Sequence, residues 1–248
     1  MYAERSPDPG LAAVVACHWH RVSESAGDLL VVPDACVDLY WGPGGPFVAG
    51  PDTGPVATAA GDVFVGVRFR PGAAAGLFGV PLHALRDQRV PLADLPAAAW
   101  PGFALLATAP PVPGGSAIPA LHHALTRAVR AAALPAEATR PARSAAPAPA
   151  PAPARLAAAL RSGRSIAETA WDLGLSERQL HRRSLAAFGY APKTLQRIIR
   201  FQHALRLARA GVPHATVAAE AGYTDQAHLS HDVKRLSGVT LSALAPRG

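Results

Sequence analysis

Two glycine-turned helical motifs, about fifty residues apart, constrain the fold of this chain more than any other feature. The first is the run Leu-Gly-Leu-Ser-Glu-Arg-Gln-Leu-His-Arg-Arg at 173–183. Gly174 interrupts a helical pattern, because glycine accepts the backbone angles of a tight turn. Ser176 and Gln179 then have the spacing of a capping box. A short helix, a glycine turn and a basic second helix are typical of a helix-turn-helix.

The second motif repeats this pattern at 217–235. Gly222 again marks a turn after an alanine-rich stretch that Thr216 can cap, and Thr224 or Asp225 can cap the helix that follows. Between the motifs, Pro192 fits a helix start, and one amphipathic helix is predicted over 193–210. Eighteen residues at 1.5 Å each span about 27 Å, which suits a spacer between two helices that lie about one DNA turn apart.

Ahead of the first motif, Ser165 and Glu168 form a further capping box that opens a predicted helix over 166–173. A short helix is predicted at 156–160. The region 155–246 resembles the DNA-binding domain of the AraC family of bacterial transcription regulators. The marks of this resemblance are Ile-Ala-Glu-Thr-Ala at 166–170, Gly-Leu-Ser at 174–176, Arg-Gln-Leu at 178–180, Phe-Gly-Tyr-Ala-Pro-Lys at 188–193, Ala-Gly-Tyr at 221–223 and Asp-Gln-Ala-His-Leu-Ser at 225–230.

The resemblance implies sequence-specific binding to double-stranded promoter DNA, and activation by recruitment of RNA polymerase more often than repression. It assigns base reading to Arg178, His181 and Arg182 in the first unit. In the second unit the groove-facing candidates are Gln226, Ala227, Ser230 and His231. Arginine suits base reading because its planar fork can bond guanine O6 and N7 together. Candidates for phosphate contacts are Arg183, Lys193, Arg197, Lys234 and Arg235.

Two positions depart from the family pattern. Ser184 stands where the family usually has a phenylalanine, and we expect this to remove apolar burial worth about 1.5–3 kcal/mol. Val239-Thr240-Leu241 departs from a usual Thr-Pro, with local consequences only.

Charge supports the division of the chain. Residues 155–248 contain 14 Arg and Lys against 6 Asp and Glu, whereas residues 1–154 are almost neutral. A basic region fused to a neutral one is typical of a nucleic-acid domain joined to an effector domain. The alternative is a basic helical bundle that binds a protein partner, which the tandem capped motifs disfavour.

The first 95 residues predict a β-rich domain. Apolar alternation indicates strands at 13–22, 36–41 and 63–70, with shorter candidates at 29–32, 47–48 and 56–58, separated by Gly/Pro turns. Residues 1–10 are expected to be irregular, and 73–78 to form a short helix. We therefore predict an α+β multidomain protein, with a small barrel-like or curled sheet before an all-α domain of two helix-turn-helix units joined by a long linker helix.

This half resembles an uncharacterised sensor-type domain found ahead of AraC-type domains in actinobacterial regulators. The motifs are Val-Pro-Asp at 32–34, Val-Asp-Leu at 37–39 and Arg-Phe-Arg-Pro-Gly at 68–72. The resemblance implies a sensor or dimerisation role and a small-molecule effector. Asp34, Asp38, Arg68 and Arg70 are candidates for ligand contacts, since arginine can hold a carboxylate bidentately. A surface ion pair, or a pair between an arginine and Asp34 or Asp38, is the competing interpretation.

Residues 96–134 contain a proline-broken segment and an amphipathic helix, predicted over 118–134 because Ile118, Leu121, Leu125 and Val129 share one face. The helix packs on its own domain or also carries a homodimer contact; both interpretations stay open. Residues 135–154 are predicted to be an Ala/Pro linker that separates the domains without a packed interface.

No catalytic constellation, cofactor or metal site is predicted. His18 and His20 share a strand face, but no third ligand follows at a recognisable spacing. Cys36 lacks a neighbour that would lower its pKa. A metal- or thiol-dependent sensor or enzyme in this half is the alternative function. With two cysteines, no signal peptide pattern and no bilayer-spanning apolar run, we expect a cytoplasmic protein without membrane association.

Overall fold

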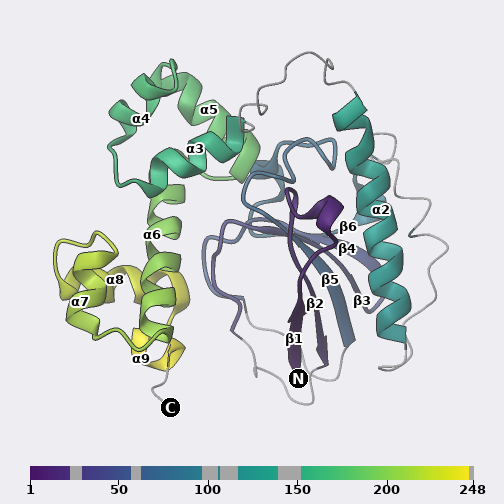
Figure 1. Cartoon of the computed structure of the whole chain (residues 1–248), viewed down its shortest axis with the longest axis horizontal. Helices are drawn as coiled ribbons and strands as arrows, with labels where there is room; N and C mark the ends of the chain where they lie inside the picture. The colour runs from purple at the N-terminus through teal and green to yellow at the C-terminus, as the bar shows by residue number, and fades with distance from the viewer. Residues whose placement is uncertain (23–29, 57–62, 97–105, 107–116, 139–151, 246–248) are drawn as a thin grey trace.

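The computed structural model describes residues 1–22, 30–56, 63–96, 106, 117–138 and 152–245. These residues form an N-terminal sheet domain and a C-terminal helical domain, which lie side by side (Figure 1). The predicted α+β division is confirmed. None of the helices in these ranges is both long and apolar enough to cross a membrane. Most of the segment 97–116 and the stretch 139–151 fall outside the described residues.

Within the described residues the sheet has six antiparallel strands in the order β1-β2-β5-β3-β4-β6. Their bounds are Tyr2–Arg5, Val15–Val22, Val63–Phe69, Val37–Gly42, Gly45–Ala49 and Arg89–Pro91 in that order. The edge strands β1 and β6 do not pair with each other, so the sheet stays open. The barrel-like expectation is therefore wrong in this respect, whereas the β-rich domain is confirmed.

The strands predicted at 13–22, 36–41 and 63–70 are present, but β1 and β6 were not predicted. β1 pairs along β2, from Tyr2 opposite Arg21 to Arg5 opposite His18. Its pairing with a distant strand, not its own short polar sequence, makes it a strand. The helix expected at 73–78 is a series of turns, because Gly72, Gly76 and Gly79 all adopt positive φ. The 3-10 helices η1 (Pro9–Leu11), η2 (Leu82–Leu85) and η3 (Leu92–Asp94) complete the connections.

One face of the sheet is covered by α2 (Ile118–Ala138), as Figure 1 shows. Leu121, Leu125 and Val129 of this helix are buried in one core cluster with Val67 and Phe69 of β5. The predicted apolar face of the helix is thus confirmed. The helix continues to Ala138, so residues 135–138 are not part of the predicted linker.

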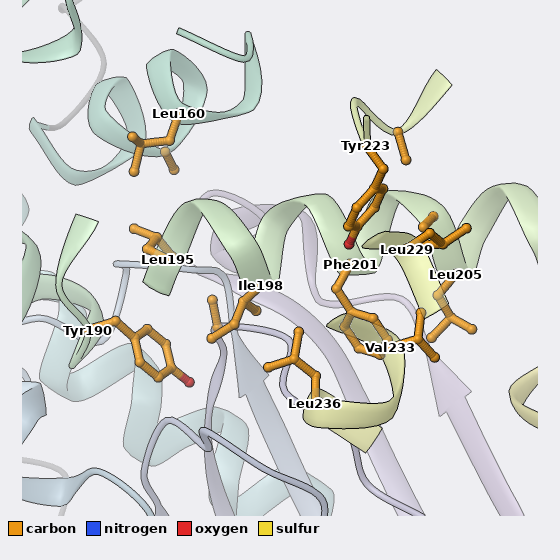
Figure 2. Packing of buried hydrophobic residues seen from close by; sticks show 14 of the residues in the cluster. Leu160, Tyr190, Leu195, Ile198, Phe201, Leu205, Tyr223, Leu229, Val233 and Leu236 are labelled. Atoms are coloured by element: carbon orange, nitrogen blue, oxygen red, sulfur yellow. The ribbon is translucent and has the colours of Figure 1, made fainter. Parts of the chain in front are cut away.

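The helical domain is built on α6 (Pro192–Arg209), which runs between two groups of helices (Figure 1). Its buried residues Leu195, Ile198, Phe201 and Leu205 form a continuous core, shown in Figure 2. The other helices are α3 (Ala152–Arg161), α4 (Ile166–Asp172), α5 (Glu177–Phe188), α7 (His214–Glu220), α8 (Gln226–Ser237) and α9 (Leu241–Leu244). The long linker helix is confirmed. The first helix is longer than predicted, and α7 begins at His214 without the side-chain cap expected from Thr216.

The two domains are packed against each other. The Tyr190 hydroxyl donates a hydrogen bond to the Asp52 carbonyl at 2.6 Å, and the Gln202 amide donates to the Pro33 carbonyl at 2.6 Å. Ala35 of the N-terminal domain belongs to the core cluster of the helical domain. The expectation of domains without a packed interface is wrong, because the loops around 33 and 52 fold against α6 and the turn before it.

Substitution of Gly189 by alanine tests this interface. It ends α5 with φ +78°, and a Cβ there would lie 2.3 Å from Cγ of Pro51 in the other domain. Gly174 has φ +64° with nothing within 4 Å of a built Cβ, so Gly174→Ala is the matched control. Both changes cost about 1–2 kcal/mol in backbone strain. Gly189→Ala adds an overpacking cost of about 1–3 kcal/mol.

Thermal unfolding of the full chain measures the difference. We expect the midpoint for Gly189→Ala to fall below that of Gly174→Ala by about 2–4 °C for each additional kcal/mol. Equal midpoints for the two variants would contradict a close contact between Gly189 and Pro51.

Candidate nucleic-acid interface

The capping residues set where both second helices of the tandem units begin. Ser176 accepts from the Gln179 backbone N–H at 3.2 Å, and the Gln179 side chain accepts from the Ser176 N–H at 2.9 Å. The same reciprocal box holds Ser165 and Glu168 at the start of α4. Asp225 caps α8 by accepting from the His228 N–H at 2.7 Å. The predicted boxes are confirmed, and Asp225 rather than Thr224 is the second cap.

The predicted base-reading side chains of α5 are all exposed. Arg178, His181 and Arg182 lie three and four residues apart on the helix, so they share one face. Leu180 on the opposite side is fully buried, which fixes how the helix is rotated. In the described part of the chain none of the three makes a side-chain hydrogen bond or ion pair, so their donors are available to a partner.

The corresponding residues of α8 have the same disposition. Gln226, Ala227, Ser230 and His231 are exposed, while Leu229 and Val233 are buried against α6. Of the predicted phosphate contacts, Arg183, Lys193, Lys234 and Arg235 are exposed as well. The two helices thus present small, polar and cationic groups to solvent. Arg197 is half-buried and differs from the rest.

A buried carboxylate ties α8 to α6. Asp232 on α8 is only 4% exposed. The Arg200 guanidinium donates to its Oδ2 at 3.2 Å, and Nε of Arg197 lies 3.6 Å from its Oδ1. Arg200 also stacks over the Tyr223 ring, with Cζ 4.4 Å from the ring centroid. Arg197 and Arg200 therefore position the second unit.

Ser184 has a structural role that its residue type did not predict. It is fully buried, and its hydroxyl donates to the Tyr190 carbonyl at 2.7 Å. This bond spans the Gly189 turn between α5 and α6. The apolar burial lost relative to a phenylalanine is accompanied by a hydrogen bond that holds the turn.

A cavity of about 390 Å³ lies between the sheet face opposite α2 and the helical domain. Its sheet side is lined by Trp19, Tyr40 and Phe64, and α6 contributes Gln202 and Leu205. Trp19 lies so close over Gly66 that a Cβ on Gly66 would be 2.4 Å from the indole ring. The cavity therefore has aromatic side chains on its sheet side and is bordered by the linker helix.

Of the four candidate ligand residues, Asp34, Asp38 and Arg68 line this cavity. Arg68 donates to both carboxylate oxygens of Asp38, at 3.0 and 3.1 Å, and lies 3.5 Å from Asp34. The nearby Asp38 carboxylate raises the pKa of Arg68. Arg70 lies outside this group, because its guanidinium donates to the Ala12 carbonyl. The structure has the internal ion pair that the sequence left as an alternative.

The structure also bears on the hypotheses of a reactive thiol and of a metal site. The Cys36 backbone N–H donates to Asp34, and burial raises the pKa of the thiol well above its usual range, so the thiol stays protonated. In the described ranges, no group of three or more His, Cys, Asp or Glu side chains is placed so that it could hold a metal ion. His18 nevertheless packs edge-on against His122 of α2, a residue that sequence spacing did not connect with it.

Each of the two domains matches a known family model. Residues 169–247 match a family model described as a helix-turn-helix domain, and residues 3–91 match one described as a domain of unknown function (DUF6597). No curated protein matches the sequence.

Among solved structures, ToxT from Vibrio cholerae O395 is similar with a TM-score of 0.46 and 10% identity, covering 93% of this chain and 99% of ToxT. A ToxT structure from Vibrio cholerae with a bound unsaturated fatty acid has a TM-score of 0.42 and 11% identity, covering 93% of each chain. The regulator CdpR from Pseudomonas aeruginosa has a TM-score of 0.31 and 19% identity over 76% of this chain and 47% of CdpR.

Removal of the Asp232 carboxylate tests how α8 is positioned. Asp232→Ala leaves two arginines without their buried partner and is expected to cost about 2 kcal/mol of unfolding free energy. Glu220→Ala removes the same charge from an exposed site on α7 and is the control. We expect a lowered thermal midpoint and weaker DNA binding for Asp232→Ala alone. Equal behaviour of the two variants would show that the arginine contacts do not position α8.

Proposed function

We propose that this chain, whose residues 169–247 form an AraC-type helix-turn-helix domain, is a one-component regulator that reads two successive major grooves of promoter DNA with α5 and α8. An α-helix fits the major groove, and its exposed side chains can reach base edges. The protein acts in the cytoplasm, without catalytic activity of its own, and activates transcription by recruiting RNA polymerase.

The observation that carries this proposal is the solvent exposure of the seven candidate base-reading side chains. All are exposed on two capped helices whose opposite faces are buried against α6. A structural role would tie such polar groups to the protein, as it does for Asp232, Arg197 and Arg200. Arg183, Lys193, Lys234 and Arg235 serve phosphate contacts. Arg197 is left out of that set because its guanidinium faces Asp232.

Arg182→Ala tests base reading, with Lys193→Ala as the comparison. Loss of an arginine that bonds guanine costs about 1–3 kcal/mol of discrimination at one base position. Loss of a phosphate contact weakens binding similarly on all sequences and reduces the salt slope by about 1. We expect selection from a random DNA pool with the full chain to return a motif that Arg182→Ala relaxes at one position and Lys193→Ala leaves intact.

Two outcomes would contradict the proposal. Equal losses for both variants on every site would remove the base-reading role of Arg182. A wild-type chain that enriches no motif would favour the protein-binding bundle. The full chain is used because Ala35 of the N-terminal domain lies in the core of the helical domain and hydrogen bonds join the two domains.

We further propose that the cavity over the sheet holds the small-molecule effector. Its occupancy can act on DNA binding because Gln202 and Leu205 of α6 line it, and Gln202 also holds Pro33. Arg68 is paired with Asp38, and Arg89 donates to Asp52 at 2.8 Å with each terminal nitrogen. With these charges matched internally and Trp19, Tyr40 and Phe64 as its floor, the cavity suits an uncharged aromatic ligand.

A matched set of indole compounds tests this chemistry. Indole is neutral, indole-3-acetate is an anion and tryptamine is a cation at pH 7. We expect ligand-detected NMR to show the strongest saturation transfer for indole. Ala49→Phe, which fills the cavity from β4, should remove the signal. Preferential binding of either charged compound, or retention of binding in Ala49→Phe, would contradict the assignment.

A further inference from the structure

Two histidines are buried between α2 and the sheet, and neither has a hydrogen-bond partner at a ring nitrogen among the described residues. His18 of β2 is 1% exposed and His122 of α2 is 3% exposed. Nδ1 and Nε2 of both rings are buried, and no atom in the described ranges forms a hydrogen bond with them. Buried polar groups are normally hydrogen-bonded, so four such nitrogens at one place need an explanation, and a bound ion or water is one that suits their chemistry.

A third histidine borders the same place. His20 follows His18 by two residues on β2 and points to the same face, since side chains alternate along a strand. The ring centroids of His20 and His122 are 5.8 Å apart, and those of His18 and His122 are 5.7 Å apart. With Zn–N distances of about 2.0–2.1 Å, two imidazoles on one ion have centroids roughly 5–5.5 Å apart. Both observed separations are within a few tenths of an ångström of that range.

We propose that His18, His20 and His122 bind a divalent transition metal ion of the zinc type, which joins α2 to β2. As the described side chains are placed, these three do not form a group that could hold a metal ion, so binding requires one of them to move. His20 is the partly exposed member, so a change of its rotamer can direct its ring toward the two buried ones. Three imidazoles suit zinc, copper or nickel, and a water can take the remaining position.

The charges around the rings are compatible with this site. Burial lowers the pKa of His18, and it lowers the pKa of His122 to about 4, so the buried rings are neutral at pH 7 and keep a lone pair. Arg5 is the cation that faces the pair from β1 and opposes a metal ion. Its side chain is exposed and can turn toward solvent, and Asp8, the acid on the same side, acts in the opposite sense on His18.

Metal binding by the full-length chain tests the site. Tag-free protein is dialysed against chelator and titrated with zinc sulfate by calorimetry, and Co²⁺ binding is followed by visible absorption. We expect one ion per chain, with affinity at least about tenfold weaker in His122→Gln and in His20→Gln. His123→Gln is the matched control, because His123 is the next residue of α2 and is exposed; its affinity should equal that of the wild type.

Either of two results would overturn the proposal: no zinc binding by the wild type, or unchanged binding in His20→Gln. A buried water would then be the partner of the two rings. If His122→Gln does not fold, His20→Gln still decides, since His20 is partly exposed. The proposal is independent of the DNA contacts, so failure of base reading leaves this experiment informative.

Discussion

The apolar face of α6 is the interaction on which the rest of the structure depends. Leu195, Ile198, Phe201 and Leu205 bury this helix against α3 and α5 at one end and against α7, α8 and α9 at the other. Neither helix-turn-helix unit has enough apolar surface of its own to be stable without it. The same helix therefore stabilises both units and sets the separation of their second helices. Apolar packing determines where α8 lies, and polar contacts such as that of Asp232 with Arg200 determine its orientation.

The N-terminal domain uses the same helix from another side. Its loops bring Pro33, Ala35 and Asp52 against α6 and the turn at Gly189 and Tyr190. The cavity over the sheet thus borders α6, the helix that sets the separation of α5 and α8. Because packed interfaces switch between discrete arrangements more readily than they deform, this arrangement provides a direct physical route between the two domains.

Local sequence patterns predicted the helical domain well and the sheet domain in part. The capping boxes at Ser165 and Ser176 and the proline at the start of α6 are local signals, and each was confirmed. β1 and β6 escaped prediction because they are strands only through their neighbours. The ion pairs of Arg197 and Arg200 escaped prediction for a related reason. Helical periodicity cannot show that a carboxylate from a distant helix is buried beside them.

By itself the sequence determined the tandem units, the faces of their second helices and the division of charge, because caps, turns and periodicity act over a few residues. Tertiary structure alone decided which groups meet across long separations. It packed the domains together despite an Ala/Pro stretch, paired Arg68 with Asp38 across neighbouring strands, and brought His122 to His18 and His20. These contacts follow from the burial of apolar faces of the whole chain, a constraint that no short segment contains.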